Sequence, residues 1–141
     1  MKILVLNGPN LNLLGKREPE IYGKENYEML MARVRDFAAG RGHTCDIFQT
    51  NHEGVMVDKI QEAEGVYDGI VINPAAYTHY SIAILDALRS VTVPAVEVHL
   101  SDISARESYR RLSVTKDGCI AQLMGKGVQG YLDAITLLEG R

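Results

Sequence analysis

Three short apolar runs of the sequence each end on a polar side chain of a type that takes part in chemistry. Asn7, Asn73 and His99 follow the runs at residues 2–6, 69–72 and 95–98. If the runs are parallel strands, these side chains meet at the carboxyl edge of one sheet, where ligands bind in open α/β folds. Asparagine at a strand end is commonly only a turn residue, so Asn7 alone indicates little.

His99 is more informative, because Glu97 precedes it by two positions. Side chains two positions apart on a strand point to the same face, which places a carboxylate beside an imidazole. Such a carboxylate holds the ring in one tautomer and orientation, as an acid–base catalyst requires. The alternative interpretation is a hydrogen-bonded pair with a purely structural role.

A second histidine, His79, closes the segment that begins at Asn73. Pro74 disfavours helix at Asn73, and Thr78 has the chemistry of an N-cap, so a helix is expected over residues 78–88. His79 would then lie in the first turn, where the helix dipole lowers its pKa. A neutral imidazole there can hydrogen-bond to a substrate hydroxyl, although an isolated histidine is more often structural.

Three arginines follow the fourth apolar run. The backbone amides of Leu100 and Ser101 come first, and Arg106, Arg110 and Arg111 come next. Guanidinium groups near exposed amides form a natural binding site for a carboxylate. A solvated helix rich in arginine is the alternative that the sequence leaves open.

The first apolar run is followed by an unusually long polar connection. Eighteen residues, 7–24, separate it from a helix expected to start near Glu25, whereas such connections usually have ~2–6 residues. Glycines and prolines within the connection allow it to hinge, so it is interpreted as an active-site lid; an exposed insertion is the alternative. Its polar residues are Asn10, Asn12, Lys16, Arg17, Glu18, Glu20 and Tyr22.

The apolar runs alternate with segments of helical periodicity along the whole chain. This alternation predicts an α/β fold with a parallel sheet covered on both faces. We expect a single domain spanning residues 1–141, a flavodoxin-like three-layer sandwich whose five-stranded parallel sheet has the order 2-1-3-4-5. The expected strands are residues 2–6, 44–48, 69–72, 95–98 and a weaker 118–120.

Composition and spacing argue against several classes of function. A net charge of -3 and a pI of about 5.8 give no case for a nucleic-acid partner, and no apolar run approaches the ~20 residues of a membrane span. Cys45 and Cys119 are not in a CxxC motif and are expected to be free thiols at opposite sheet edges of a cytoplasmic protein. The four histidines and the carboxylates show no metal-ligand spacing, so no metal is expected.

A glycine motif near the end of the chain suggests a nucleotide site at first sight. Residues 125–130, GKGVQG, match the GxGxxG pattern after a predicted strand. The dinucleotide-binding unit also needs a second strand and an acidic residue ~20 positions further on, but the chain ends 11 residues later. Close packing of a helix on the sheet is therefore the preferred explanation, and nucleotide binding is the weaker alternative.

These residues, taken together, resemble the type II 3-dehydroquinate dehydratases of the shikimate and quinate pathways. The resemblance runs through nearly the whole chain, and its most specific blocks occur in the order of that family. The blocks are LVLNGPNLNLLG at 4–15, REPEIYG at 17–23, NHEG at 51–54, NPAAYTH at 73–79 and EVHLS at 97–101.

The resemblance implies a metal-free lyase that needs no cofactor. Its substrate is 3-dehydroquinate, which loses water by anti elimination through an enolate to give 3-dehydroshikimate. The reaction serves shikimate and aromatic amino acid biosynthesis or quinate breakdown. The competing hypothesis is a non-catalytic flavodoxin-like module that binds a small hydroxy acid.

The resemblance also implies roles for individual residues. Tyr22 is the base that removes the proton beside the ketone, and Arg17 favours its phenolate. His99, supported by Glu97, is the acid that protonates the departing hydroxyl. A tyrosine has an ordinary pKa of ~10, so a base of this kind needs a nearby cation and a closed, water-poor site.

Further implied roles concern binding of the substrate. Asn10 and Asn73 hold the water or substrate oxygens around the enolate, and His79 and Arg110 bind substrate hydroxyls. Oriented donors of this kind are what a developing enolate requires.

Two more implications concern the carboxylate and the assembly. The backbone at Leu100 and Ser101 takes the substrate carboxylate, and Asp86 reaches the site of a neighbouring subunit. The resemblance implies a homododecamer built as four trimers, which makes the trimer the functional unit.

Four positions depart from the usual pattern of that family. Asp102 replaces a common Asn, Ser104 a common His, Tyr80 a common Thr and Leu85 a common Arg. A charge at Asp102 is expected to weaken binding of the carboxylate, and Leu85 to alter the subunit contact that presents Asp86. Neither touches the implied base or acid.

Overall fold

Five parallel strands form one sheet in the order β2-β1-β3-β4-β5 in the computed structural model, which describes residues 1–16, 20 and 25–141. The predicted order is therefore confirmed. The strands are β1 Lys2–Asn7, β2 Thr44–Gln49, β3 Gly69–Asn73, β4 Ala95–His99 and β5 Ala121–Met124.

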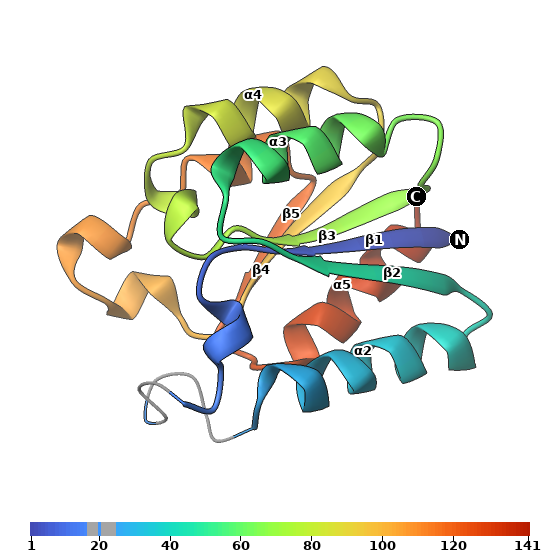
Figure 1. The fold of residues 1–141 in the computed structure, drawn as a ribbon, viewed down its shortest axis with the longest axis horizontal. Coiled ribbons are helices and arrows are strands. Elements are labelled where there is room, and N and C mark those ends of the chain that lie inside the picture. Colours follow the sequence, from blue (N-terminus) through green and yellow to red (C-terminus); the bar gives the residue numbers. More distant parts are fainter. Residues whose placement is uncertain (17–19, 21–24) are drawn as a thin grey trace.

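Helices cover both faces of the sheet (Figure 1). Helices α2 (Tyr27–Gly40) and α5 (Gln129–Glu139) lie on one side. Helices α3 (Glu53–Glu62) and α4 (Ile82–Ser90) lie on the other. This arrangement confirms the predicted flavodoxin-like three-layer sandwich.

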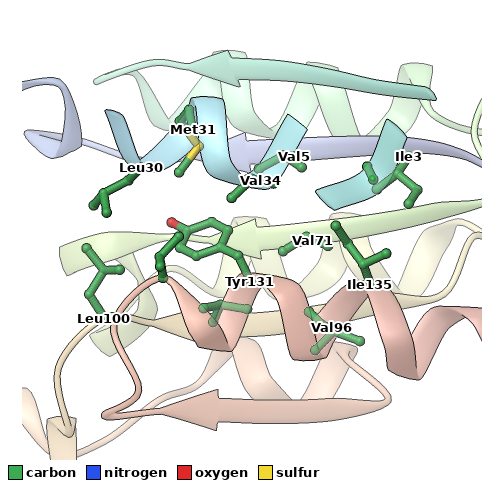
Figure 2. Close-up of a cluster of buried hydrophobic side chains, with 14 of the residues drawn as sticks. Ile3, Val5, Leu30, Met31, Val34, Val71, Val96, Leu100, Tyr131 and Ile135 are labelled. Atoms are coloured by element: carbon green, nitrogen blue, oxygen red, sulfur yellow. The ribbon is translucent and has the colours of Figure 1, made fainter. Parts of the chain in front are cut away.

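Side-chain alternation along the strands divides the core into two clusters. In β1, Ile3 and Val5 face α2 and α5, whereas Leu4 and Leu6 pack in the cluster that includes residues of α3 and α4. The central strands are buried along nearly their whole length, because helices cover both faces of a parallel sheet. Figure 2 shows the first cluster, in which Tyr131 of α5 lies among aliphatic side chains.

Short 3-10 helices gather at the carboxyl edge of the sheet, at the left of Figure 1. They are η1 Leu11–Leu13, η2 Ala75–His79, η3 Ile103–Ala105 and η4 Ser108–Arg110. The long connection after β1 runs to α2, which begins at Tyr27 with Asn26 as its N-cap. Arg17 and Tyr22 lie outside the described residues, so the lid remains a prediction.

The fifth strand lies three residues beyond its predicted position. Residues 118–120 were expected to form it, but Gly118 instead ends a further 3-10 helix, η5 Thr115–Gly118. A Cβ at Gly118 would lie 2.7 Å from Cβ of Leu88, so glycine lets this segment pass close to α4. The true strand lacks an Ile or Val run because it is a half-buried edge strand.

The start of α4 also differs from the expectation. Ser81, not Thr78, is its N-cap, and the Ser81 hydroxyl accepts a hydrogen bond from the amide of Ile84 at 3.0 Å. Thr78 is fully buried and its hydroxyl is directed at Glu97. His79 therefore belongs to η2 rather than to the first turn of α4.

The two cysteines agree with the expectation of free thiols. Cys45 in β2 is a free thiol. Cys119 is free as well, although it precedes β5 instead of lying within it. Among the described residues, no helix has the length and apolar character needed to cross a membrane.

Replacing Gly8 with alanine should destabilise the protein. The added Cβ would lie 2.5 Å from the carbonyl oxygen of Pro74, while the Gly8 amide donates to the carbonyl of Asn73 at 2.8 Å. The backbone must therefore shift, at a cost of about 1–3 kcal/mol, measured by urea denaturation. Gly54→Ala in α3 is the control, because nothing lies within 4 Å of its Cβ position. It should stabilise by up to about 1 kcal/mol, and equal stabilities for the two variants would contradict the expectation.

Candidate active site

A pocket opens at the carboxyl edge of the sheet, where η1, η2 and η3 meet the ends of β3 and β4. It has a volume of about 150 Å³. Seven of the predicted site residues line it, from four separate stretches of the chain. They are Asn10, Asn73, His79, His99, Leu100, Ser101 and Arg110.

The other predicted site residues lie elsewhere. Glu97 is fully buried beneath the pocket and contacts it through His99. Asp86 is exposed on α4 and does not line the pocket of its own chain. Arg17 and Tyr22 fall outside the described part of the chain.

Glu97 and His99 form the predicted pair on one face of β4. Nε2 of His99 lies 2.8 Å from Oε2 of Glu97, and only 5% of His99 is exposed. An ionised carboxylate can only accept hydrogen bonds, so Nε2 carries the proton of this bond. Nδ1 is then the ring nitrogen available to a ligand in the pocket.

Four further donors surround the Glu97 carboxylate. Oε2 accepts from the hydroxyl of Ser113 at 2.7 Å, from the amide of Gln122 at 2.8 Å and from the hydroxyl of Thr78 at 3.1 Å. Oε1 accepts from the hydroxyl of Thr115. These residues come from η2, the segment before η5, η5 itself and β5, so no local spacing in the sequence pointed to them.

These donors keep Glu97 charged despite its burial. Burial alone would raise the pKa of the carboxyl, but the hydrogen bond and charge of His99, with the hydroxyls of Thr115 and Ser113, hold it at about 2. The carboxylate is therefore ionised across the neutral range. The Glu97 carboxylate thus places a negative charge directly behind the His99 ring.

His79 is held with one nitrogen free for a ligand. Its Nδ1 lies 2.7 Å from the carbonyl oxygen of Leu112 and donates to it, which leaves Nε2 for the pocket. Burial lowers the pKa of His79, and the neighbouring His99, Arg110 and Arg106 lower it further, against the hydrogen bond to Leu112. The predicted direction is correct, but the cause is not a helix N-terminus.

Two of the three expected arginines reach the pocket. Arg106 and Arg110 line it, and Nε of Arg110 lies 3.2 Å from Oε2 of Glu107. Arg111 instead donates to the backbone carbonyl of Arg106 at 2.6 Å. Arg106 is thus a lining residue that had no individual role in the prediction. Two arginines in the lining make the pocket suited to an anionic ligand.

Asp102 and Ser104, two of the positions that depart from the usual family pattern, are hydrogen-bonded to each other. Oδ1 of Asp102 accepts from the amide of Ser104 at 3.0 Å and from its hydroxyl at 2.5 Å. Asp102 caps η3 in this way and is exposed. Neither residue lines the pocket. Their substitution therefore leaves the lining of the pocket intact.

One glycine of the motif, Gly130, allows the close helix–sheet packing that was expected. A Cβ at Gly130 would lie 3.2 Å from Cγ1 of Val98, so glycine brings the start of α5 close to the sheet. No described residue from 125 to 130 lines the pocket. Within the described ranges, no group of three or more His, Cys, Asp or Glu side chains is placed to hold a metal ion.

Comparison with known proteins places this architecture in a family. The model of the family described as dehydroquinase class II matches residues 1–139. A 3-dehydroquinate dehydratase of Halalkalibacterium halodurans is 54% identical over 98% of this chain and 96% of its own length. One of Clostridium acetobutylicum is 52% identical over 99% of this chain and 96% of its own length.

Solved structures agree with these relatives. The type II dehydroquinase of Butyrivibrio crossotus superposes with a TM-score of 0.97 at 52% identity, covering 99% of this chain and 97% of that one. A 3-dehydroquinate dehydratase-like protein of Bifidobacterium longum is more distant, with a TM-score of 0.70 at 28% identity, covering 100% of this chain and 99% of that one.

Replacing Thr115 with valine should destabilise the protein in a pH-dependent manner. A lowered carboxyl pKa contributes stability above the unfolded value near 4.5, and this contribution is lost as the pH falls toward 2. Loss of one donor raises the pKa of Glu97 and removes about 1.5–3 kcal/mol near pH 7. Urea unfolding at pH 7 and at pH 3 measures this difference, which should shrink at the lower pH.

Thr136→Val on the exposed side of α5 is the matched control. It should change stability by less than about 0.5 kcal/mol at either pH. A Thr115→Val effect of the same size at pH 7 and pH 3 would show that the hydroxyl does not act through the Glu97 charge.

Proposed function

This chain belongs to the class II dehydroquinase family, and from that premise we propose that it removes water from 3-dehydroquinate to give 3-dehydroshikimate. The observation that carries the proposal is the buried, ionised Glu97 bonded to His99, whose ring lines a pocket with two arginines. The reaction needs an acid that delivers a proton to a hydroxyl beside a carboxylate, and this pair meets that need.

The elimination requires a base and an acid on opposite sides of the substrate. The base takes the proton beside the ketone, and the electrons of the C–H bond form an enolate. The enolate then re-forms the ketone as the C–O bond of the hydroxyl breaks, and the acid donates its proton to the departing oxygen. One water leaves, and the product is a conjugated enone.

His99 acts as the acid in this scheme. Glu97 orients its ring through Nε2, so Nδ1 carries the proton that is delivered to the departing hydroxyl. The negative charge of Glu97 lies behind the ring from which the proton leaves. The five donors around the carboxylate keep that charge in place without solvent.

Tyr22 acts as the base, with Arg17 as the cation that favours its phenolate. Both lie in the segment between η1 and α2, whose flanking residues approach the site: Leu14 lines the pocket, and Tyr27 contacts Asn7 at the end of β1. Arg17 retains its charge at every working pH, which a tyrosine base at neutral pH requires.

The remaining lining residues hold the substrate. Asn10 and Asn73 provide oriented donors for the enolate oxygen or for a water bound to it. Nε2 of His79 and the guanidinium of Arg110 bind the substrate hydroxyls.

The substrate carboxylate binds the backbone amides of Leu100 and Ser101. The chemistry described uses no cofactor or metal. The enzyme is cytoplasmic and works in shikimate and aromatic amino acid biosynthesis or in quinate breakdown.

The assembly proposed is a homododecamer of four trimers. Asp86 is exposed on α4 and lies outside the pocket lining of its own chain, as a residue that serves a neighbouring subunit must. Symmetric oligomers place such a residue at every equivalent interface. Leu85 beside it is buried within its own chain.

Adding 3-dehydroquinate should produce the ultraviolet absorbance of a conjugated enone, with no effect of a chelator. Tyr22→Phe should lower kcat by about 10²–10⁴-fold, the usual contribution of a general base, without loss of the fold by circular dichroism. Tyr67→Phe is the matched control, because the Tyr67 hydroxyl bonds Asp46 outside the pocket. A wild-type protein that binds the substrate but gives no absorbance rise would favour the non-catalytic module instead.

Asp86→Ala should lower activity, whereas Asp58→Ala on the exposed side of α3 should not. Co-expression of the Asp86→Ala and Tyr22→Phe chains tests whether Asp86 acts across an interface. A mixed trimer contains sites with an intact Tyr22 from one subunit and an intact Asp86 from the next. Activity above the sum of the separate variants is expected, and activity no greater than that sum would place Asp86 in its own subunit's site or in none.

A further inference from the structure

Four polar side chains form a continuous hydrogen-bonded chain on the α2 and α5 side of the sheet. Nδ2 of Asn73 lies 2.9 Å from the hydroxyl of Tyr131, which lies 2.7 Å from Oδ1 of Asn7. Nδ2 of Asn7 lies 3.1 Å from the hydroxyl of Tyr27. This row of hydrogen bonds therefore runs from Asn73 in the pocket lining to Tyr27, the first residue of α2.

The direction of every bond in this chain follows from its ends. Oδ1 of Asn73 accepts from the amide of Ala75 at 3.1 Å, so Nδ2 must face Tyr131 and donate to it. The Tyr131 proton then goes to Oδ1 of Asn7, and Nδ2 of Asn7 donates onward to Tyr27 and to the sulfur of Met31. One N–H of the Asn73 amide is left for a ligand in the pocket.

The four hydrogen-bonded side chains lie in a largely apolar environment, where polar groups are unfavourable unless they are paired. Asn7 is fully buried, and 1% of Tyr131 and 3% of Asn73 are exposed. The Tyr131 ring packs in the aliphatic cluster shown in Figure 2. A phenylalanine at 131 would fill nearly the same space, so the hydroxyl serves the two amides rather than the packing of the ring.

The paired strands explain how one hydroxyl reaches both amides. Asn7 and Asn73 are direct register partners at the ends of β1 and β3, and both side chains point to the α5 face. Tyr131 lies in the first turn of α5, which Gly130 brings close to the sheet at Val98. The hydroxyl thus holds the carboxyl ends of two central strands through their side chains.

We propose that Tyr131 is a positioning residue that fixes the orientation of the Asn73 amide toward the reacting oxygen. The proposal rests on the proposed function, in which Asn73 donates to the enolate oxygen or its water. An amide held from behind presents its free N–H in one direction, whereas a released amide rotates. Stabilisation that is specific to the transition state then falls, which lowers kcat more than it raises KM.

Tyr131→Phe tests this proposal. We expect kcat to fall by about 10- to 100-fold, less than the loss of a complete oxyanion donor, with KM changed by less than about threefold. Ile135→Val is the matched control, one turn further along α5 and also fully buried. It weakens the packing of the same helix but removes none of the hydrogen bonds of Tyr131. It should lower Tm while kcat stays at the wild-type value.

The possible outcomes separate the role of Tyr131 from the proposed function. A Tyr131→Phe variant with a lower Tm but a kcat within about twofold of wild type would show that the hydroxyl is only structural. If the wild-type protein does not turn over 3-dehydroquinate, the proposed function fails. Crystal structures of wild type and variant then decide the positioning role alone: a rotated or two-conformer Asn73 amide in Tyr131→Phe supports it, and an unchanged amide overturns it.

Discussion

The bond between a fully buried carboxylate and His99 is the constraint around which this site is organised. An ionised Glu97 without solvent is unfavourable unless its oxygens are satisfied. Three hydroxyls and one amide meet this need with His99, and they come from η2, η5, the segment before it and β5. The same carboxylate thereby determines where those segments pass. Its low pKa is a consequence of this satisfaction.

The parallel sheet separates the polar groups of the site into two networks. Along β4, Glu97 and His99 point toward the α3 and α4 face, whereas Asn7 and Asn73 at the ends of β1 and β3 point toward the α2 and α5 face. The two networks meet at the pocket, where His99 and Asn73 both line the wall. The proposed acid, His99, and the proposed enolate donor, Asn73, are thus supported independently, each from its own face of the sheet.

The sequence was sufficient for the features that depend on local periodicity. Alternating apolar runs predict a five-stranded parallel sheet, for which 2-1-3-4-5 is a common order, and the structure has this order. The two-residue spacing predicts that Glu97 and His99 share a face, which the structure confirms. The half-buried edge strand β5 has no such pattern. Thr78 was expected to cap a helix, but its hydroxyl donates a hydrogen bond to the buried carboxylate of Glu97. Contacts between distant segments, such as Ser113 and Gln122 with Glu97, leave no local pattern. The roles of Tyr22 as base and Arg17 as its supporting cation rest on the family resemblance.

The most direct test of the central claim is the steady-state kinetics of Glu97→Gln on 3-dehydroquinate. A glutamine side chain occupies nearly the same volume but removes the negative charge behind His99. The account predicts a fall in kcat of about 10²–10⁴-fold, with KM near the wild-type value and the fold retained by circular dichroism. A kcat within about threefold of wild type would contradict it, because the buried charge would then have no part in the proton transfer.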